Sequence, residues 1–277
     1  MSREELLRDR CRQLLADGAV AMVVGWRAGS RSGTAQPCFI TKPEDTAQLI
    51  CDERCSQNIA GYLARVKHMG KLAVVARGCD SRSIVCLLKE RQLERDRLHI
   101  IGVGCTGIRE NGELSDACST CVQPNPVLCD EMVGEATPQP GAIAKPAETG
   151  PTPDTRWQEL SAEVARCIRC YACRQACPNC YCPVCFVDAT QPQLVGKTTG
   201  LSDNMVFHIM RALHMAGRCV ECGACSRACP MQIDLMRFNR EAARIARERF
   251  GTSAGMNLEE PPALAAFDPN DPQEFIR

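Results

Sequence analysis

One cysteine pattern occurs twice in the C-terminal half of the chain. It reads Cys-x2-Cys-x2-Cys-x3-Cys-Pro, and it starts first at Cys167 and again at Cys219. Such a doubled run is typical of ferredoxins with two 4Fe-4S clusters, because thiolates three residues apart can each reach one iron of a cube. A zinc ribbon uses two Cys-x2-Cys pairs, and neither a ribbon nor a finger needs the third cysteine and the Cys-Pro of each run. The pattern therefore predicts two iron–sulfur clusters rather than zinc.

The fourth cysteine of each run is expected to ligate the cluster of the other run, as in two-cluster ferredoxins. This cross-ligation assigns four thiols to each cluster. The first cluster is expected on Cys167, Cys170, Cys173 and Cys229, and the second on Cys219, Cys222, Cys225 and Cys177.

Composition narrows the class of protein further. The chain has 21 cysteines in 277 residues, and it carries 33 basic and 33 acidic side chains. A balanced charge lacks the basic surface that nucleic acid binding requires. The start of the chain is charged and no long apolar run occurs, so neither a signal peptide nor membrane insertion is expected. We expect a cytoplasmic protein whose thiols hold metal, since stable disulfides are rare in that compartment.

A βαβ unit is the clearest pattern of the N-terminal half. Apolar runs at 72–76 and 98–103 are typical of buried parallel strands, and the helix between them is expected to be capped by Asp80 or Ser81. Ligand sites in parallel sheets lie beyond the carboxyl ends of the strands. Cys79 and Cys105 each follow one of these ends, so both are expected to face one crevice.

A third 4Fe-4S cluster is predicted at this crevice. Cys118 and Cys121 follow shortly in a turn-rich segment, and with Cys79 and Cys105 they make four thiols, with Cys55 as a substitute ligand. The alternative is that Cys79 and Cys105 are small buried hydrophobic residues. The turn formed by Gly78, Asp80 and Ser81 opens a helix, so a phosphate or flavin contact is predicted there.

Three further thiols, Cys180, Cys182 and Cys185, remain without a role. They could complete the third cluster, hold a fourth, or pack in the interior. Cys51, which precedes Cys55, is likewise unassigned.

The pattern predicts two folded parts. Residues 1–133 are expected to form an α/β domain with a small parallel sheet, including one helical segment from about 41 to 69. Residues 134–155, rich in proline and glycine, are predicted to be a linker. Residues 156–250 are predicted to form an all-α dicluster domain, and residues 251–277 an extended tail. In the helix expected at 201–216, the apolar side is predicted to consist of Met205, Val206, Ile209, Met210, Leu213 and Ala216.

The dicluster part resembles the helical dicluster ferredoxin domains of succinate dehydrogenase and heterodisulfide reductase subunits. Up to about Phe250 the chain is similar to the beta-subunit family of deazaflavin-coenzyme-reducing hydrogenases and formate dehydrogenases. The matching segments are residues 72–80, residues 100–107 and the two cysteine runs. The resemblance implies iron–sulfur clusters, and FAD as a further cofactor.

The expected function is therefore electron transfer. We expect an iron–sulfur subunit of a cytoplasmic oxidoreductase complex of anaerobic metabolism, such as a formate dehydrogenase, a hydrogenase or a heterodisulfide-reductase-like assembly. Its partners are expected to be catalytic or flavin subunits. The alternative is a subunit that contains FAD and itself oxidises or reduces a soluble electron carrier.

Overall fold

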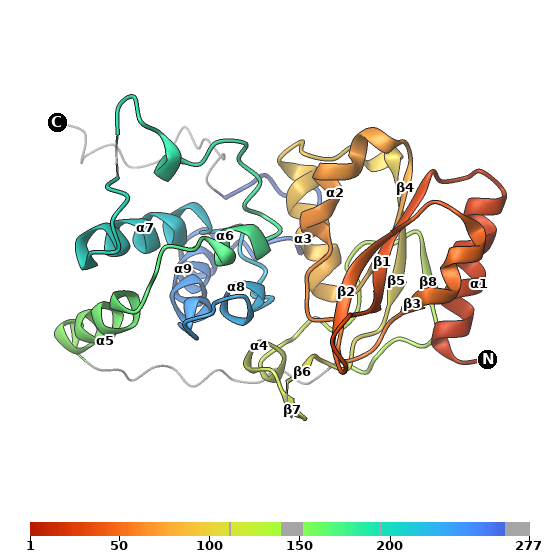
Figure 1. Ribbon diagram of the computed structural model, residues 1–277, viewed down its shortest axis with the longest axis horizontal. Coiled ribbons are helices and arrows are strands. Elements are labelled where there is room, and N and C mark those ends of the chain that lie inside the picture. The colour runs from red at the N-terminus through yellow and green to blue at the C-terminus, as the bar shows by residue number, and fades with distance from the viewer. Residues whose placement is uncertain (111, 140–151, 194, 264–277) are drawn as a thin grey trace.

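The computed structural model describes residues 1–110, 112–139, 152–193 and 195–263. A sheet with flanking helices lies at one end of the molecule, and a group of helices around the two cysteine runs lies at the other (Figure 1). Residues 1–139 are called the N-terminal region below, and residues 152–263 the C-terminal region. The middle of the expected linker (140–151) and the end of the expected tail (264–277) lie outside the described residues.

The N-terminal region is built on a six-stranded sheet with the order β2-β1-β4-β5-β8, in which β3 also pairs with β1. Strands β1, β4, β5 and β8 are parallel, whereas β2 and β3 run antiparallel to β1. The sheet is thus mixed, which corrects the expectation of a parallel one. The bounds are β1 Met22–Ala28, β2 Ala35–Ile40, β3 Leu49–Ile50, β4 Leu72–Ala76, β5 Leu98–Val103 and β8 Glu131–Val133.

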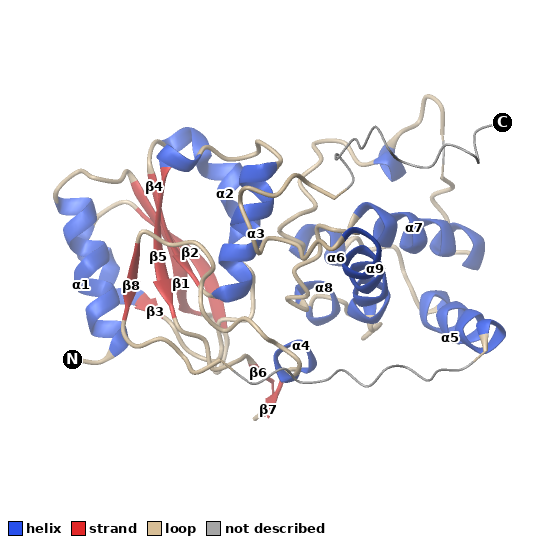
Figure 2. Cartoon of the chain, turned by 180° about the vertical axis from the view of Figure 1, so that it is seen from behind, coloured by secondary structure: helices blue, strands red, loops and turns tan. Residues whose placement is uncertain are grey.

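The predicted βαβ unit is present. Strand β4 is buried along its whole length and pairs in parallel with β5, and α3 (Gly78–Lys89) connects them. Helices α2 (Ala60–Val66) and α3 lie on the side of the sheet that faces the C-terminal region, while α1 (Arg3–Ala16) lies on the far side (Figures 1 and 2). A short hairpin of β6 (Arg109–Glu110) and β7 (Glu113–Leu114) and the helical turn α4 (Asp116–Ser119) follow β5.

The expectation of one helical segment from 41 to 69 is wrong. The chain forms a 3-10 turn at Pro43–Gln48, the strand β3, an irregular loop, and only then α2. Leu49 pairs with Arg27 of β1, and the following loop supplies carbonyl groups to the buried side chain of Arg77. These tertiary contacts outweigh the local helical pattern.

The elements of the C-terminal region are helices joined by the cysteine loops. They are α5 Pro153–Ala165, α6 Ala172–Ala176, a 3-10 turn at Phe186–Asp188, α7 Leu201–His214, α8 Ala224–Arg227 and α9 Leu235–Phe250. Each of α6 and α8 follows the second cysteine of a run, and the two pack against each other. No helix of the described ranges is long and apolar enough to cross a lipid bilayer.

Helix α7 buries only part of the side that its apolar pattern predicts, since Met205 is buried as expected. Val206, Met210 and Leu213 are exposed, whereas Asn204 and Arg211 are buried. The amide of Asn204 donates to the main-chain oxygens of Val164, Cys167 and Thr199, and the guanidinium of Arg211 donates to that of Cys173. Irregular cysteine loops leave carbonyl groups unpaired, and buried polar groups require partners. The polar side of α7 therefore faces the loops.

Polar contacts join the two regions. Arg82 of α3 donates to the carbonyl oxygens of Val220 and Ala254, and Arg227 of α8 donates to that of Ser56. The first residues of the expected tail therefore lie against α3. Arg240 of α9 forms an ion pair with Asp116, at 3.0 Å.

Candidate iron–sulfur centres

The first cysteine run surrounds a small cavity together with one residue of the second run. The thiol-bearing residues that line it are Cys167, Cys170, Cys173 and Cys229. The rest of the wall is mostly apolar, with Phe207 and Ile233 among its residues, and it also includes the buried His208. This is the set of three thiols plus one that cross-ligation requires.

The second run forms the reciprocal arrangement. Its cavity is lined by Cys219, Cys222, Cys225 and Cys177. In the described part of the chain, no three His, Cys, Asp or Glu side chains converge at the spacing of a single metal ion. Four thiols around a cavity fit a cube, whose irons take one thiolate each, better than a mononuclear site.

Both runs follow the same backbone path. In the first, Arg169 and Tyr171 have positive φ angles of 55° and 60°, and in the second Glu221 and Gly223 have 58° and 72°. These residues lie directly before and after the second cysteine of their run. Left-handed positions are costly for residues other than glycine. Their recurrence at equivalent positions gives the two runs the same loop geometry.

Burial raises the pKa of several thiols in these cavities. The pKa of Cys173 rises to about 12, and those of Cys177 and Cys222 to about 11, although nearby arginines lower them. Free thiols at these three positions therefore stay protonated at neutral pH. Binding of iron would release these protons, because only the thiolate is a ligand.

Sequence reasoning missed the buried residues that support the cysteine loops. Arg211 is 5% exposed, its guanidinium donates to the main-chain oxygen of Cys173 at 3.1 Å, and it lines the cavity of the second run. Asn239 of α9 is also buried, and its amide nitrogen lies 3.8 Å from the sulfur of Cys225. The signal was the stripe of polar residues at helical spacing on α7, which the apolar residues between them obscured.

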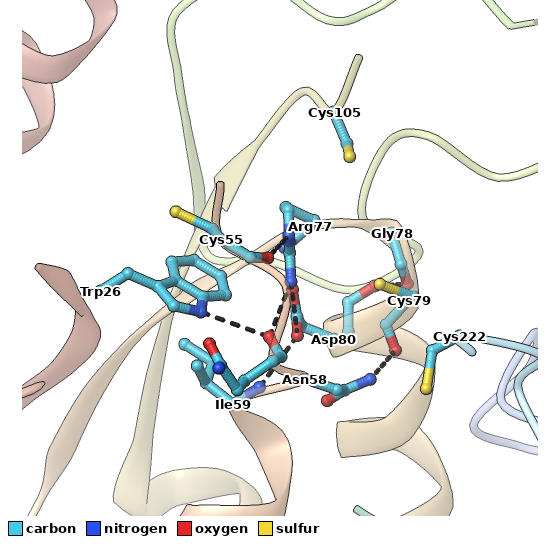
Figure 3. Close-up of polar contacts among 12 residues, drawn as sticks. Trp26, Cys55, Asn58, Ile59, Arg77, Gly78, Cys79, Asp80, Cys105 and Cys222 are labelled. Atoms are coloured by element: carbon cyan, nitrogen blue, oxygen red, sulfur yellow. Dashed lines mark hydrogen bonds and ion pairs between the residues drawn. The ribbon is translucent and has the colours of Figure 1, made fainter. Parts of the chain in front are cut away.

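A larger cavity, of about 500 Å³, lies between the two regions at the carboxyl end of the sheet, and it is called the interdomain cavity below. All four thiols predicted for a third cluster line it, namely Cys79, Cys105, Cys118 and Cys121. Main-chain N–H groups of Gly107 and Ile108 donate to the sulfurs of Cys105 and Cys118, each at 3.3 Å. Cys222 of the second run reaches the same cavity, beside Cys79 (Figure 3).

A buried ion pair fixes the start of α3 beside this cavity. Arg77 and Asp80 are 3% and 0% exposed and lie 2.8 Å apart, and the guanidinium stacks on Trp26 (Figure 3). Asp80 also accepts from the main-chain N–H groups of Ile59 and Arg77. These contacts hold the loop that precedes α2 against the helix that carries Cys79.

The residues predicted to contact a phosphate or flavin differ in their positions. Asp80 is engaged by Arg77, and the hydroxyl of Ser81 donates to Gly78 and accepts from Val127. Only Gly78 lines the interdomain cavity. A Cβ atom at Gly78 would lie 1.9 Å from the carbonyl oxygen of Gln123, so glycine lets this loop pass over the helix start.

The remaining thiols lie elsewhere. Cys51 and Cys55 are 4% and 0% exposed and do not line the interdomain cavity, so Cys55 is not placed to act as a substitute ligand. Cys180, Cys182 and Cys185 line a separate cavity on the other side of the second run.

Comparison with known proteins points to the same chemistry. A family model described as a 4Fe-4S dicluster domain matches residues 166–234. The chain is 36% identical to the "F420-dependent formate dehydrogenase subunit beta" of Methanocaldococcus jannaschii over 98 residues, which are 35% of this chain and 25% of that protein. It is 24% identical to the "F420-dependent formate dehydrogenase 1 subunit beta" of Methanococcus maripaludis over 92% of both chains.

These similarities cover different parts of the chain. The family model covers the two cysteine runs alone, and the alignment with the first relative spans a quarter of that protein's length. The second alignment extends over most of both chains at lower identity. Taken together with the doubled cysteine run, they identify the chain as an iron–sulfur protein with a 4Fe-4S dicluster domain, related to the beta subunits of formate dehydrogenases.

Proposed function

We propose that this chain is the iron–sulfur electron-transfer subunit of a cytoplasmic oxidoreductase complex, which relays electrons between a catalytic or flavin subunit and an acceptor. The observation that carries the proposal is the arrangement of the thiols. Two sets of three thiols plus one surround two cavities in the C-terminal region, and a third set of four lines the cavity between the regions. When bound, clusters at these places supply one-electron transfer.

The contact between neighbouring sites supports a relay. Cys222 lines both the second-run cavity and the interdomain cavity. A group held at Cys79 and Cys105 would therefore be separated from the second cluster by little more than one side chain. The carboxyl end of the sheet is the expected entry or exit point for electrons.

The third cluster is part of the proposal. Its four thiols come from two strand ends and from the segment that contains α4, and two of the sulfurs already accept main-chain N–H groups. Such donors stabilise thiolates in iron–sulfur sites and tune their potentials. The C-terminal region adds Arg247 and its ion-pair partner Glu221 to the lining.

A flavin is the second candidate for this cavity, and one observation favours it. The interdomain cavity is much larger than the cavities of the two cysteine runs. FAD bound there would make the chain a subunit that itself oxidises or reduces a soluble carrier. Cys79, Cys105, Cys118 and Cys121 line the same space, so a cluster and a flavin would compete for it.

Anaerobic purification with iron, sulfide and flavin analysis separates these alternatives. Three clusters give about twelve iron atoms per chain. The variant Cys118→Ser/Cys121→Ser should then lose about four iron atoms, whereas Cys129→Ser, which changes a half-buried thiol outside these cavities, should lose none. Unchanged iron in the double variant would contradict the third cluster, and one flavin per chain would favour the alternative.

The relay itself is tested on the complex. Both relatives are named as formate dehydrogenase subunits, so formate is the first donor to try with the co-purified assembly. We expect formate to reduce the clusters in the assembly, seen by electron paramagnetic resonance, but not in the isolated chain. If the isolated chain contains a bound flavin and by itself reduces a dye, this result would contradict the relay and favour the alternative.

A further inference from the structure

Three cysteines outside the sites described above share one cavity. Cys180, Cys182 and Cys185 line a space of about 680 Å³ that also borders α2 and the end of α7. This cavity shares none of its lining residues with the interdomain cavity. The three thiols are therefore not placed to complete the third cluster.

Packing does not explain these thiols either. Buried cysteines of this chain that act as small hydrophobic residues, such as Cys11 and Cys38, are 0% and 4% exposed. In contrast, Cys182 is exposed and the other two are partly exposed. The segment that carries them has no regular secondary structure until the 3-10 turn at Phe186–Asp188.

The charge of the cavity suits an anionic occupant. Its lining includes Arg65, Arg174, Arg211 and Arg218, and Asp188 is the one acidic residue among them. Asp188 is paired with Arg174, at 2.7 Å, and Arg218 is paired with Glu90, so Arg65 and Arg211 supply the remaining positive charge. A cluster bound by thiolates is anionic, and a buried anion requires nearby positive charge or hydrogen-bond donors.

We infer that Cys180, Cys182 and Cys185 bind a fourth iron–sulfur cluster in this cavity. In the described part of the chain, these thiols do not converge at the spacing of a single metal ion, and the same is true of the thiols of the two cysteine runs. Three thiolates leave one iron of a cube for another ligand, and the same cavity is lined by His214. The inference rests on the proposed function in one respect, namely that the two cysteine runs hold their iron–sulfur clusters.

The position of this site gives it a place in the relay. Cys177 and Pro178 line both this cavity and that of the second run. The second cluster would thus have a neighbour on each side, one through Cys222 and one through Cys177. The exposed thiol of Cys182 and the adjacent Val184, which is 71% exposed, bring the new site to the protein surface.

Thiol alkylation of the iron-loaded parent chain tests the inference without a mutation. An exposed free thiol reacts readily with iodoacetamide, whereas a thiolate bound to iron does not. We expect Cys182 to be protected in the anaerobic native protein and to be labelled after a chelator has removed the iron. Labelling of Cys182 at the rate of a free thiol in the loaded protein would overturn the inference.

Iron content provides the second measurement. The variant Cys180→Ser/Cys182→Ser/Cys185→Ser should lose about four iron atoms per chain and keep the signals of the dicluster part. Cys129→Ser is the control and should lose none. A triple variant with the parent's iron content would overturn the inference, and if that variant does not fold, the alkylation result decides. Absence of the dicluster signals from the parent would instead contradict the proposed function.

Discussion

Glu90 at the end of α3 and Arg218 directly before the second cysteine run form an ion pair between the two regions. The Nη2 atom of Arg218 donates to a carboxylate oxygen of Glu90 at 2.6 Å, and both side chains are largely buried. The hydroxyl of Tyr181 donates to the same carboxylate, also at 2.6 Å. One carboxylate thus binds α3 to the segments that enter and leave the cysteine loops.

Replacement of this carboxylate should destabilise the chain. Glu90→Gln leaves the guanidinium of Arg218 without its charged partner in a partly buried place, so we expect a loss of about 1–3 kcal/mol in the free energy of unfolding. Urea denaturation under anaerobic conditions measures it. Glu159→Gln, which breaks the more exposed pair with Arg237, is the matched control and should cost less than about 1 kcal/mol. Equal effects of the two variants would contradict the role of Glu90.

Cross-ligation predicts an effect of one run on the cluster of the other. Cys229 belongs to the second run but lines the cavity of the first. Cys229→Ser should therefore alter or remove the first cluster and leave the second one reducible. Electron paramagnetic resonance with iron analysis distinguishes the clusters, with Cys38→Ser as a buried control thiol away from both. Loss of the second cluster alone would refute the assignment.

Removal of the buried charge of Arg211 should make reduction harder. Its guanidinium lines the second-run cavity and donates to the loop of the first run, so it stabilises the extra electron of a reduced cluster. We expect Arg211→Gln to lower a reduction potential by on the order of 50 mV. Redox titration measures the shift, and Arg244→Gln, on the exposed side of α9, should cause none. An unchanged or higher potential in Arg211→Gln would contradict this role.

A buried thiol in α1 should make stability depend on alkaline pH. Burial raises the pKa of Cys11 to about 12, whereas an unfolded chain has a cysteine pKa of about 8.5. The unfolded state thus loses its proton first, so the contribution of Cys11 is full below about pH 8.5 and declines as the pH rises from there toward 12.

Cys11→Ala isolates this effect. At pH 7 the variant should be less stable by about 1 kcal/mol, because it removes a buried sulfur. In urea denaturation the difference should narrow above pH 8.5 and change sign before pH 10.5, because two pH units of unequal ionisation are worth about 2.7 kcal/mol. A difference that does not change with pH would show that the thiol ionises in the folded protein.

The parts that sequence predicted well rest on short-range patterns. The unit β4-α3-β5 was predictable because β4 is a continuous apolar run and β5 is apolar apart from His99. The assignment of the thiols to three clusters, made from spacing and from the rule for strand ends, stays a prediction. The helix starts at Gly78, slightly before the predicted caps, because the carboxylate of Asp80 accepts the N–H of Arg77.

The parts that sequence did not predict depend on contacts between distant segments. The loop before α2 is irregular because its carbonyl groups bind Arg77. Helix α7 turns its amide and guanidinium groups inward because the cysteine loops, whose backbone bonds are not visible in a pattern, need donors. The separation of Cys180, Cys182 and Cys185 from the interdomain cavity likewise depends on packing.

Cys222 lines both the second-run cavity and the interdomain cavity, and this position affects how the protein tolerates air. The wall between the second cluster and the interdomain cavity is thin, and the N-terminal region closes that cavity from the other side. Removal of the N-terminal region, which would leave the C-terminal region as a small soluble electron carrier, would expose this side of the cavity to dissolved oxygen. The N-terminal region would therefore shield a cluster bound at the second run, and a fragment without this region should bleach faster in air than the whole chain.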